Sequence, residues 1–188
     1  MTDEMWTFER LAQASRATLE KVLVRSKAPR RQRLAGTVYK GYNHDWLGQL
    51  PGKKFRKVFF QRDGAYYGLN QVVIQDGNDF TGEWRLKMEK GAAVERGYFS
   101  VVPAAELHPQ ESLGRYRHLL RFDYDTDPNP RWNFLMRSIQ DFVGLPNEED
   151  YSVLLGKAYL RILPDAYIFA SYFVLEQLEA NASGILLA

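Results

Sequence analysis

Residues 53–75 read KKFRKVFFQRDGAYYGLNQVVIQ, and this stretch decides the fold class. Two runs rich in Phe, Tyr and Val flank the dipeptide Asp63-Gly64, which is a strong short-range signal for a β-hairpin. Aromatic and β-branched residues favour extended backbone because their side chains pack well on a pleated surface. We therefore predict two antiparallel strands, Lys53–Gln61 and Ala65–Gln75, joined by a tight turn.

Runs of the same kind recur along the chain on both sides of this hairpin. The further predicted strands are Leu34–Tyr42, Thr81–Met88, Arg96–Val102, Tyr116–Asp125, Tyr151–Ile162 and Ala166–Glu176. Gly, Asp, Asn or Pro residues separate most of these runs, which is typical of antiparallel strands with short turns. Eight sequential strands leave two unprotected edges unless the sheet closes on itself. We therefore predict a mainly β fold, an eight-stranded antiparallel up-and-down barrel.

Two segments have the period of an amphipathic helix instead. Residues 7–26 place Phe8, Leu11 and Leu19 on one face of an N-terminal helix. The second segment, Arg131–Val143, lies between the predicted sixth and seventh strands. An eight-stranded barrel has room inside for side chains or one small ligand, but not for a helix. Both helices are therefore expected to cap an end of the barrel or to lie against its wall.

The length and the charge balance indicate one globular domain. We predict a single domain, 1–188, with the helix at 7–26, the barrel over 34–176 and an apolar tail over 181–188. The 25 Lys and Arg residues nearly balance the 23 Asp and Glu residues, which excludes a strongly cationic nucleic-acid binder. The basic run 25–33 is interpreted as a solvated connector, with contact to a phosphate or anionic surface as the alternative.

The pattern of a secretion signal or a membrane span is missing from the sequence. The N-terminus is acidic, and no apolar run of a signal peptide follows it. The longest nearly apolar run, Tyr167–Leu175, is much shorter than the roughly 20 residues that span a bilayer. We expect a cytoplasmic protein without a membrane span. The apolar tail 181–188 is expected to dock on its own barrel or on a second copy, which would make a homo-oligomer.

The sequence also lacks the residue patterns of common metal sites and nucleophilic enzymes. It has no cysteine, so disulfides, thiolate metal sites and a cysteine nucleophile are excluded. The three histidines, His44, His108 and His118, lie on separate segments without the spacing of metal ligands. We therefore expect no metal and no cofactor. No catalytic residue is assigned, and His118 is the best candidate for one.

The alternation within Tyr116–Asp125 indicates what the barrel encloses. Tyr116, His118 and Phe122 share the face of this strand that is expected to point inward. A cavity lined by Tyr and Trp with a few oriented polar groups is typical of a site for a small molecule. The predicted ligand-binding residues are Tyr39, Arg56, Tyr67, Asn70, Trp84, Tyr116, His118, Phe122 and Lys157.

Ordinary packing is the alternative interpretation of these residues. His118 would then be an interior histidine that its neighbours satisfy, and Arg56 and Lys157 would extend outward to solvent. Asn70 would mark a bulge or a turn, since Gly68 stands just before it. The ligand-site prediction therefore depends on the whole set of residues and not on any single member.

Residues 34–39, LAGTVY, resemble the opening strand of lipocalin-type barrels, where a short helix leads into a strand with a Gly-x-Trp motif. Val38 stands at the position of the tryptophan. Residues 173–176, FVLE, are similar to the last strand of small bacterial lipocalin-like (calycin-type) proteins of unassigned function. The resemblance covers residues 34–176. It implies a small-molecule cavity open at one end, which stores a hydrophobic ligand or guides a cyclisation or isomerisation.

Three functions are consistent with this interpretation. The first is binding of a hydrophobic or aromatic small molecule in the barrel cavity, where apolar burial supplies affinity. The second is a lipocalin-like cyclase or isomerase for a polyketide-like or terpenoid-like substrate, with His118 or a tyrosine hydroxyl moving a proton. The third is a non-catalytic structural or interaction subunit, in which side chains fill the barrel. The interior volume of the barrel separates the third function from the first two.

Overall fold

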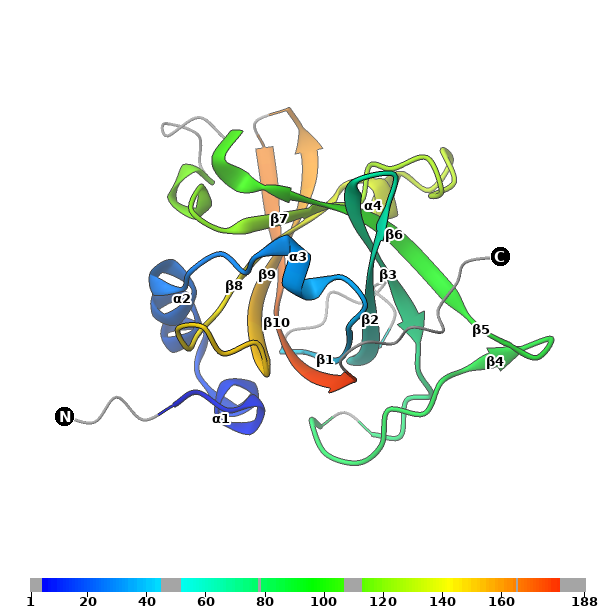
Figure 1. Cartoon of the computed structure of the whole chain (residues 1–188), viewed down its shortest axis with the longest axis horizontal. Helices are drawn as coiled ribbons and strands as arrows, with labels where there is room; N and C mark the ends of the chain where they lie inside the picture. Colours follow the sequence, from blue (N-terminus) through cyan, green and yellow to red (C-terminus); the bar gives the residue numbers. More distant parts are fainter. Residues whose placement is uncertain (1–4, 45–51, 78, 107–112, 165, 180–188) are drawn as a thin grey trace.

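Eight strands close into an antiparallel barrel in this computed structural model, which describes residues 5–44, 52–77, 79–106, 113–164 and 166–179 (Figure 1). Around the ring the strands are β1 (Val38–Asn43), β2 (Lys54–Arg62), β3 (Ala65–Val72), β6 (Glu95–Pro103), β7 (Leu120–Asp123), β8 (Ile139–Gly144), β9 (Val153–Leu163) and β10 (Ala166–Glu179). Strand β10 pairs with β1 and completes the ring. The predicted mainly β, up-and-down barrel is therefore confirmed.

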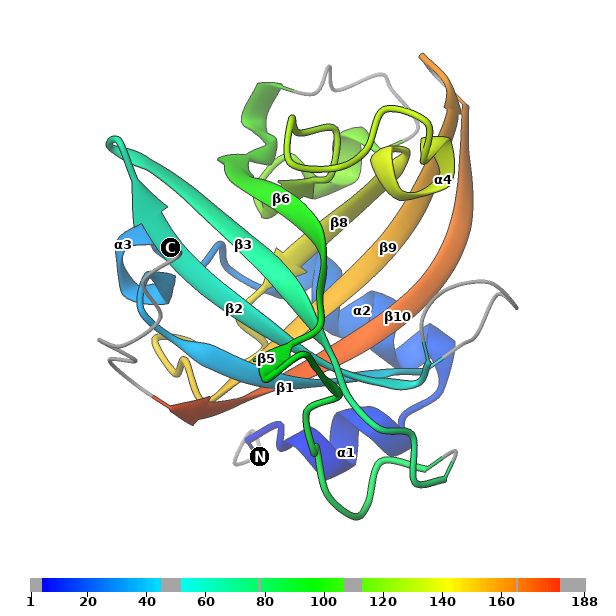
Figure 2. The same ribbon diagram turned by 90° about the vertical axis from the view of Figure 1, so that its right-hand side faces the viewer.

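The helices lie outside the barrel. They are α1 (Phe8–Gln13), α2 (Arg16–Arg25), α3 (Arg31–Leu34), which leads into β1, and α4 (Phe134–Arg137), which lies between β7 and β8. The predicted helix 7–26 is two helices, because the backbone is extended at Ala14 and Ser15. Ser15 Oγ accepts a hydrogen bond from Thr18 N at 3.2 Å and so caps α2. Helix α1 packs on β10 and α2 on β9 (Figure 2).

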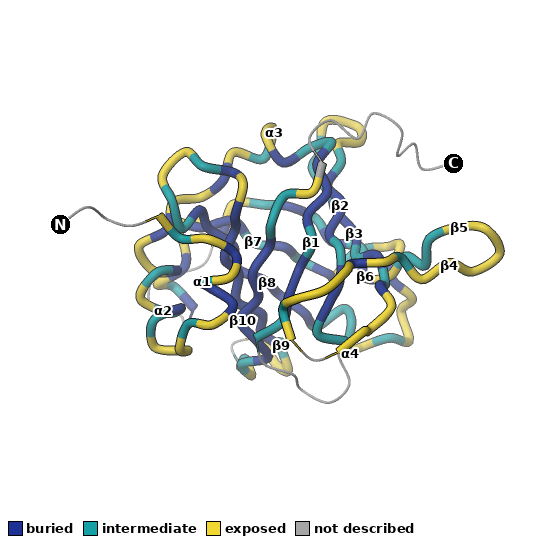
Figure 3. Tube along the Cα trace, turned by 90° about the horizontal axis from the view of Figure 1, so that it is seen from below, coloured by how far each residue is buried: buried dark blue, intermediate teal, exposed yellow. Residues whose placement is uncertain are grey.

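One predicted strand, Thr81–Met88, is not part of the barrel. This segment passes outside β1, where the indole of Trp84 donates a hydrogen bond to Gly41 O at 2.9 Å. It then continues into a small two-stranded arm, β4 (Met88–Glu89) and β5 (Ala92–Ala93), which is largely exposed (Figure 3). Trp84, a predicted ligand-binding residue, therefore lies outside the barrel wall.

The predicted helix Arg131–Val143 is also corrected by the structure. A short helix does lie between the predicted sixth and seventh strands, but α4 lasts only one turn. The last residues of the predicted helix, from Ile139 on, belong to the barrel strand β8, Ile139–Gly144. Every residue of β8 is buried, and a strand buried on both faces shows no polar alternation that would distinguish it from a helix.

The barrel wall separates two buried cores. The aromatic residues of the interior core are Tyr39, Phe55, Phe59, Phe99, Phe122, Tyr124, Tyr151 and Phe173. The outer core lies between the wall and helices α1 and α2, and its aromatic residues are Phe8, Tyr42, Trp84, Tyr116, Phe142, Tyr159 and Tyr172. Much of the wall is therefore buried on both faces, as the dark strands in Figure 3 show.

Three glycines make room for three of the interior rings. Each glycine lies directly opposite a phenylalanine on the neighbouring strand, and the pairs are Gly41 with Phe55, Gly68 with Phe99, and Gly156 with Phe173. A Cβ atom on any of these glycines would lie 2.1–2.4 Å from the ring. The rings thus occupy the space that side chains on the opposite strands would otherwise fill.

Candidate functional site

An ion pair crosses the interior of the barrel. Lys57 projects inward from β2 and Asp141 projects inward from β8, which stands on the opposite side of the ring. The Nζ of Lys57 lies 3.2 Å from Oδ2 of Asp141. It also donates hydrogen bonds to Asn70 Oδ1 at 2.9 Å and to the Tyr124 hydroxyl at 2.6 Å. We call these four residues the Lys57 cluster.

The Lys57 cluster is buried among aromatic rings. The side chains of Lys57 and Asp141 are only 3% and 4% exposed. The rings of Phe55, Phe99, Phe122, Tyr124 and Phe173 have their centroids 4.6–5.7 Å from Nζ. A cation close to ring faces is attracted by their electron density, and this attraction is stronger away from water. The rings therefore offset part of the cost of burying the ammonium group.

Burial moves the pKa values of this pair toward the neutral forms. Burial lowers the pKa of the Lys57 ammonium group, and the charge of Asp141 opposes that shift. Burial also raises the pKa of the Asp141 carboxyl group, against the opposing effect of Lys57. The pKa of Tyr124 is raised well above 10.0, first by burial and then by the Asp141 charge. The tyrosine hydroxyl therefore stays protonated and donates to Asp141 Oδ2 at 3.1 Å.

A small cavity lies against the Lys57 cluster. Its volume is about 70 Å³, enough for roughly two water molecules at about 30 Å³ each. The residues that line it are Asn43, Phe55, Lys57, Asn70, Tyr124, Met136, Ile139, Asp141, Ala158 and Phe173. The cavity thus brings together groups that donate and groups that accept hydrogen bonds, within an otherwise apolar wall.

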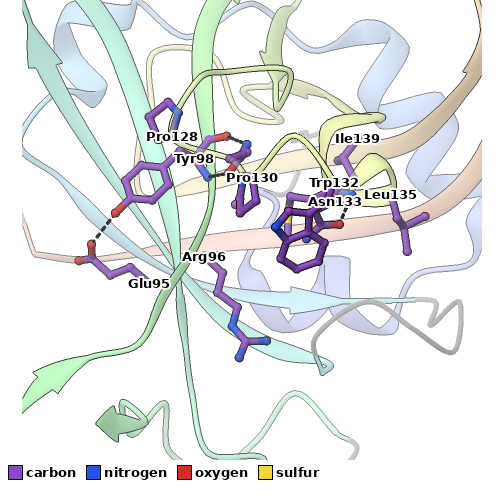
Figure 4. Close-up of a pocket in the computed structure, with 12 residues that line it drawn as sticks. Glu95, Arg96, Tyr98, Pro128, Pro130, Trp132, Asn133, Leu135 and Ile139 are labelled. Atoms are coloured by element: carbon purple, nitrogen blue, oxygen red, sulfur yellow. Dashed lines mark hydrogen bonds between the residues drawn. The ribbon is translucent and has the colours of Figure 1, made fainter. Parts of the chain in front are cut away.

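An open groove adjoins this cavity at the end of the barrel beside α4. The groove has a volume of about 660 Å³ and shares Met136 and Ile139 with the cavity as lining residues. Its other walls carry the Tyr98 ring, the Trp132 ring and Leu135 (Figure 4). Trp132 is 77% exposed. Met136 and Ile139 therefore stand between a large exposed groove and the buried polar cluster.

The opposite end of the barrel, beside α3, is packed with side chains. Phe59 contacts the rings of Tyr39 and Phe122 there, and Leu34 of α3 belongs to the same buried cluster. The Tyr39 hydroxyl donates a hydrogen bond to Tyr151 O at 2.8 Å. Space for a ligand is thus found at the α4 end, while aromatic packing fills the α3 end.

The structure brings only part of the predicted site together. Tyr39, Asn70 and Phe122 lie inside the barrel, and Asn70 belongs to the Lys57 cluster. Arg56 and Tyr67 lie on the outer face of the wall, where Tyr67 stacks on Phe60. Trp84, Tyr116 and Lys157 belong to the outer core under α1 and α2.

The expected inward position of His118 is wrong. Residues Gly114–Tyr116 form a 3₁₀ helix, His118 is exposed in the turn that follows, and strand β7 begins only at Leu120. Leu120 and Phe122 therefore point inward as predicted, but His118 does not. His118 has no contact with the cavity and is not a candidate for catalysis there.

A second buried cluster lies outside the barrel wall and surrounds Glu20 of α2. Lys157 Nζ lies 2.8 Å from Glu20, and the Tyr116 hydroxyl donates to Glu20 at 2.7 Å. Tyr172 and Arg115 also contact this carboxylate. Burial alone would raise the pKa of Glu20, but these hydrogen bonds, first that of Lys157, lower it overall. This arrangement attaches α2 to the wall, and it explains why Tyr116 and Lys157 are buried.

The prediction of Arg56 as a cavity residue selects the wrong face of β2, because Phe55, Lys57 and Phe59 point inward. Asp141 is missed for another reason, because β8 lies within the segment predicted as the helix Arg131–Val143. A lysine with phenylalanine two residues away on each side was the available signal, because residues i and i+2 share one face of a strand.

Two further classes of site are not found in the described part of the chain. Within it, no group of three or more His, Asp or Glu side chains could hold a metal ion. Among the described helices, none combines the length and the apolar surface needed to cross a membrane. No protein-family profile matches the sequence, and no curated protein is significantly similar to it.

Proposed function

We propose that this chain binds a hydrophobic or aromatic small molecule that has a small polar end group. The polar end lies in the cavity at the Lys57 cluster, and the apolar body lies in the groove along Trp132, Leu135 and Met136. One observation carries the proposal: a buried charged cluster meets a cavity whose lining continues into an exposed groove that is mostly apolar and has Glu95 and Arg96 at its wall. Small-molecule sites typically combine apolar walls with a few convergent polar groups.

The energetics of the ion pair support a role in binding. Burying two charges costs several kcal/mol of desolvation, and apolar residues of similar size are often as stable or more stable. The Lys57 cluster is therefore poorly explained by stability alone. A ligand end group that accepts from Lys57 or Asn70 and donates to Asp141 would make use of both charges.

The exposed groove supports the same proposal. Single exposed apolar residues are ordinary, but Trp132 and Leu135 line a groove of about 660 Å³ together with the buried side of Met136. Each 100 Å² of apolar surface that a ligand covers there contributes about 2.5 kcal/mol of favourable transfer energy. The groove thus supplies affinity, and the cavity supplies orientation.

Titration calorimetry with a panel of aromatic alcohols, ketones and carboxylic acids, including cinnamyl alcohol, tests the proposal. We expect Leu135→Asp to weaken binding of any panel member that binds, because it places a charge in the groove. Leu163→Asp is the matched control, since Leu163 is also exposed but lies on the β9–β10 hairpin outside the groove. Absence of binding across the panel, or equal binding by both variants, would contradict the proposal.

A structural or interaction subunit is the second candidate function. The aromatic packing at the α3 end favours it, because a filled barrel needs no ligand. Failure of every panel member to bind would favour this candidate. A cyclase or isomerase, a cytoplasmic location, the lipocalin-like relationship and a homo-oligomer formed through residues 181–188 all stay predictions; the tail lies outside the described residues.

A further inference from the structure

We propose that Lys57 forms a reversible imine with an aldehyde ligand whose carbonyl group enters the cavity. The inference rests on the proposed function, because the carbonyl reaches Lys57 only if the apolar body occupies the groove. It adds a covalent step and names the chemical class of the ligand, a hydrophobic or aromatic aldehyde.

The position of the amine carries this inference. Lys57 lines the cavity, and its Nζ is held by three partners on three other segments of the barrel interior. The cavity of about 70 Å³ admits an end group of two or three heavy atoms beside the amine. A formyl group has that size, and the groove accepts the remainder of the molecule. The amine is therefore fixed where a small carbonyl would arrive.

The surroundings of Lys57 favour the reactive form of the amine. Only a neutral amine attacks a carbonyl, and burial among rings lowers the pKa of Lys57. The exposed lysines, such as Lys87, lack this burial. Asp141 at 3.2 Å takes the proton that the amine gives up, and its own raised pKa suits that role.

The step balances without an oxidant or a reductant. The neutral Lys57 nitrogen bonds to the carbonyl carbon while the carbon–oxygen π bond breaks, and the proton that the nitrogen then loses goes to the oxygen, which gives a carbinolamine. The protonated Asp141 next gives its proton to the hydroxyl group, the remaining carbon–oxygen bond breaks, water leaves, and a protonated imine remains beside the Asp141 carboxylate. Tyr124 and Asp141 lie 2.6 Å and 3.2 Å from Nζ, so both are placed to move protons in these steps. The imine nitrogen keeps Asp141 as its counter-ion.

Lys157, one of three buried lysines in the described part of the chain together with Lys54 and Lys57, gives an internal control. Lys157 is 8% exposed, close to the value for Lys57, and it also lies among tyrosine rings. It differs because it contacts the partly exposed Glu20, and it does not line the cavity. If burial alone made a lysine reactive, both residues would form the adduct.

The test is to incubate the full chain with cinnamaldehyde and sodium cyanoborohydride, which reduces an imine to a stable amine. Intact mass and peptide mapping then locate the adduct. We expect one adduct at low aldehyde excess, located on Lys57, with Lys157 unmodified. Modification of exposed lysines while Lys57 stays unmodified would overturn the inference.

The non-covalent analogue separates this inference from the proposed function. Suppose that cinnamyl alcohol binds, that Leu135→Asp weakens its binding, and that cinnamaldehyde leaves Lys57 unmodified. The proposed imine would then be wrong, and the proposed binding site would be supported. If neither compound reaches the site, both proposals fail. An adduct on Lys57 that Leu135→Asp prevents supports both proposals.

Double variants that are expected to keep the fold give an independent test. Lys57→Met combined with Asp141→Leu removes the amine without leaving a buried charge, and we expect the adduct to be lost while the circular dichroism spectrum is kept. Lys157→Met combined with Glu20→Leu is the matched control, and we expect it to keep the adduct on Lys57. Persistence of the same adduct in the first double variant would contradict the assignment.

Discussion

Lys57 on β2 and Asp141 on β8 form an ion pair across the full width of the barrel, with 3.2 Å between Nζ and Oδ2. The two strands are not neighbours in the sheet and share no backbone pairing, so this pair links opposite sides of the ring through side chains. The link lies between the aromatic packing of the α3 end and the cavity at the α4 end, which both residues line. It therefore affects both the stability of the barrel and the chemistry of the site.

Removal of one partner from this pair should lower the free energy of unfolding strongly, while removal of both partners should lower it only slightly. We expect Lys57→Met to lower the free energy of unfolding by about 3–5 kcal/mol, because it leaves the Asp141 carboxylate buried without a counter-ion. Adding Asp141→Leu should restore most of that loss. Urea denaturation of the two variants measures the difference. Lys87→Met, which breaks an exposed pair with Glu89, should change stability by less than about 1 kcal/mol.

The Glu20 cluster predicts a loss of stability in acid. The pKa of Glu20 in the folded protein is below its ordinary value of 4.5, so the unfolded chain binds the proton more readily. The contribution of Glu20 is therefore complete above pH 4.5 and disappears as the pH falls through the folded-state pKa. We expect Glu20→Gln to cost about 3 kcal/mol at pH 7, because Lys157 loses its partner.

The pH dependence itself tests this explanation. Thermal unfolding of the wild-type chain and of Glu20→Gln should be compared between neutral pH and mild acid. The difference between the two proteins should shrink as the pH falls below 4.5. A difference that stays constant over this range would show that Glu20 acts by packing and not through its charge.

The glycines opposite phenylalanine rings should tolerate no side chain. A Cβ atom at position 156 would lie 2.1 Å from the Phe173 ring, so we expect Gly156→Ala to lower stability by about 1–3 kcal/mol through overpacking. Combining it with Phe173→Leu should cost less than the sum of the two single changes. Denaturant titration of the three variants gives the coupling energy, and strict additivity would contradict the proposed contact.

Filling the cavity should prevent binding without unfolding the protein. Ala158 lines the cavity and is buried, so Ala158→Leu places its added carbon atoms in the cavity of about 70 Å³. We expect loss of binding for panel members that bind the wild type, with the melting temperature unchanged or raised. His118→Ala serves as the control, because His118 is exposed and away from the cavity. Calorimetry that shows unchanged binding by Ala158→Leu would exclude this cavity.

The barrel could be predicted from the sequence, but the side of the wall that faces inward often could not. The hairpin around Asp63-Gly64 has its expected place, with β2 and β3 on either side. Where helices cover the outside of the barrel, as they do over β9, both faces of a strand are apolar. The alternation of polar and apolar residues then no longer shows which face points inward. For this reason the sequence pattern predicts Lys157 in the cavity and predicts a helix where β8 lies.

The Lys57 cluster could not be predicted because its members are far apart in the sequence. Lys57 and Asp141 are separated by 84 residues and meet only when the ring closes. Tyr124 lies in a segment whose inward face was predicted, yet its hydroxyl partners were unknown. A prediction of this cluster would have needed the correct inward face of both β2 and β8.

The three Gly–Phe pairs have a consequence for how the chain finds its alignment. A slip of one residue between neighbouring strands turns every side chain to the wrong face, but a slip of two residues keeps the faces correct. In the pair β1–β2, such a slip would set Phe55 against Tyr39 or Asn43 instead of Gly41. At each of these three strand junctions, the space beside the glycine therefore favours the one register in which the phenylalanine ring lies opposite it.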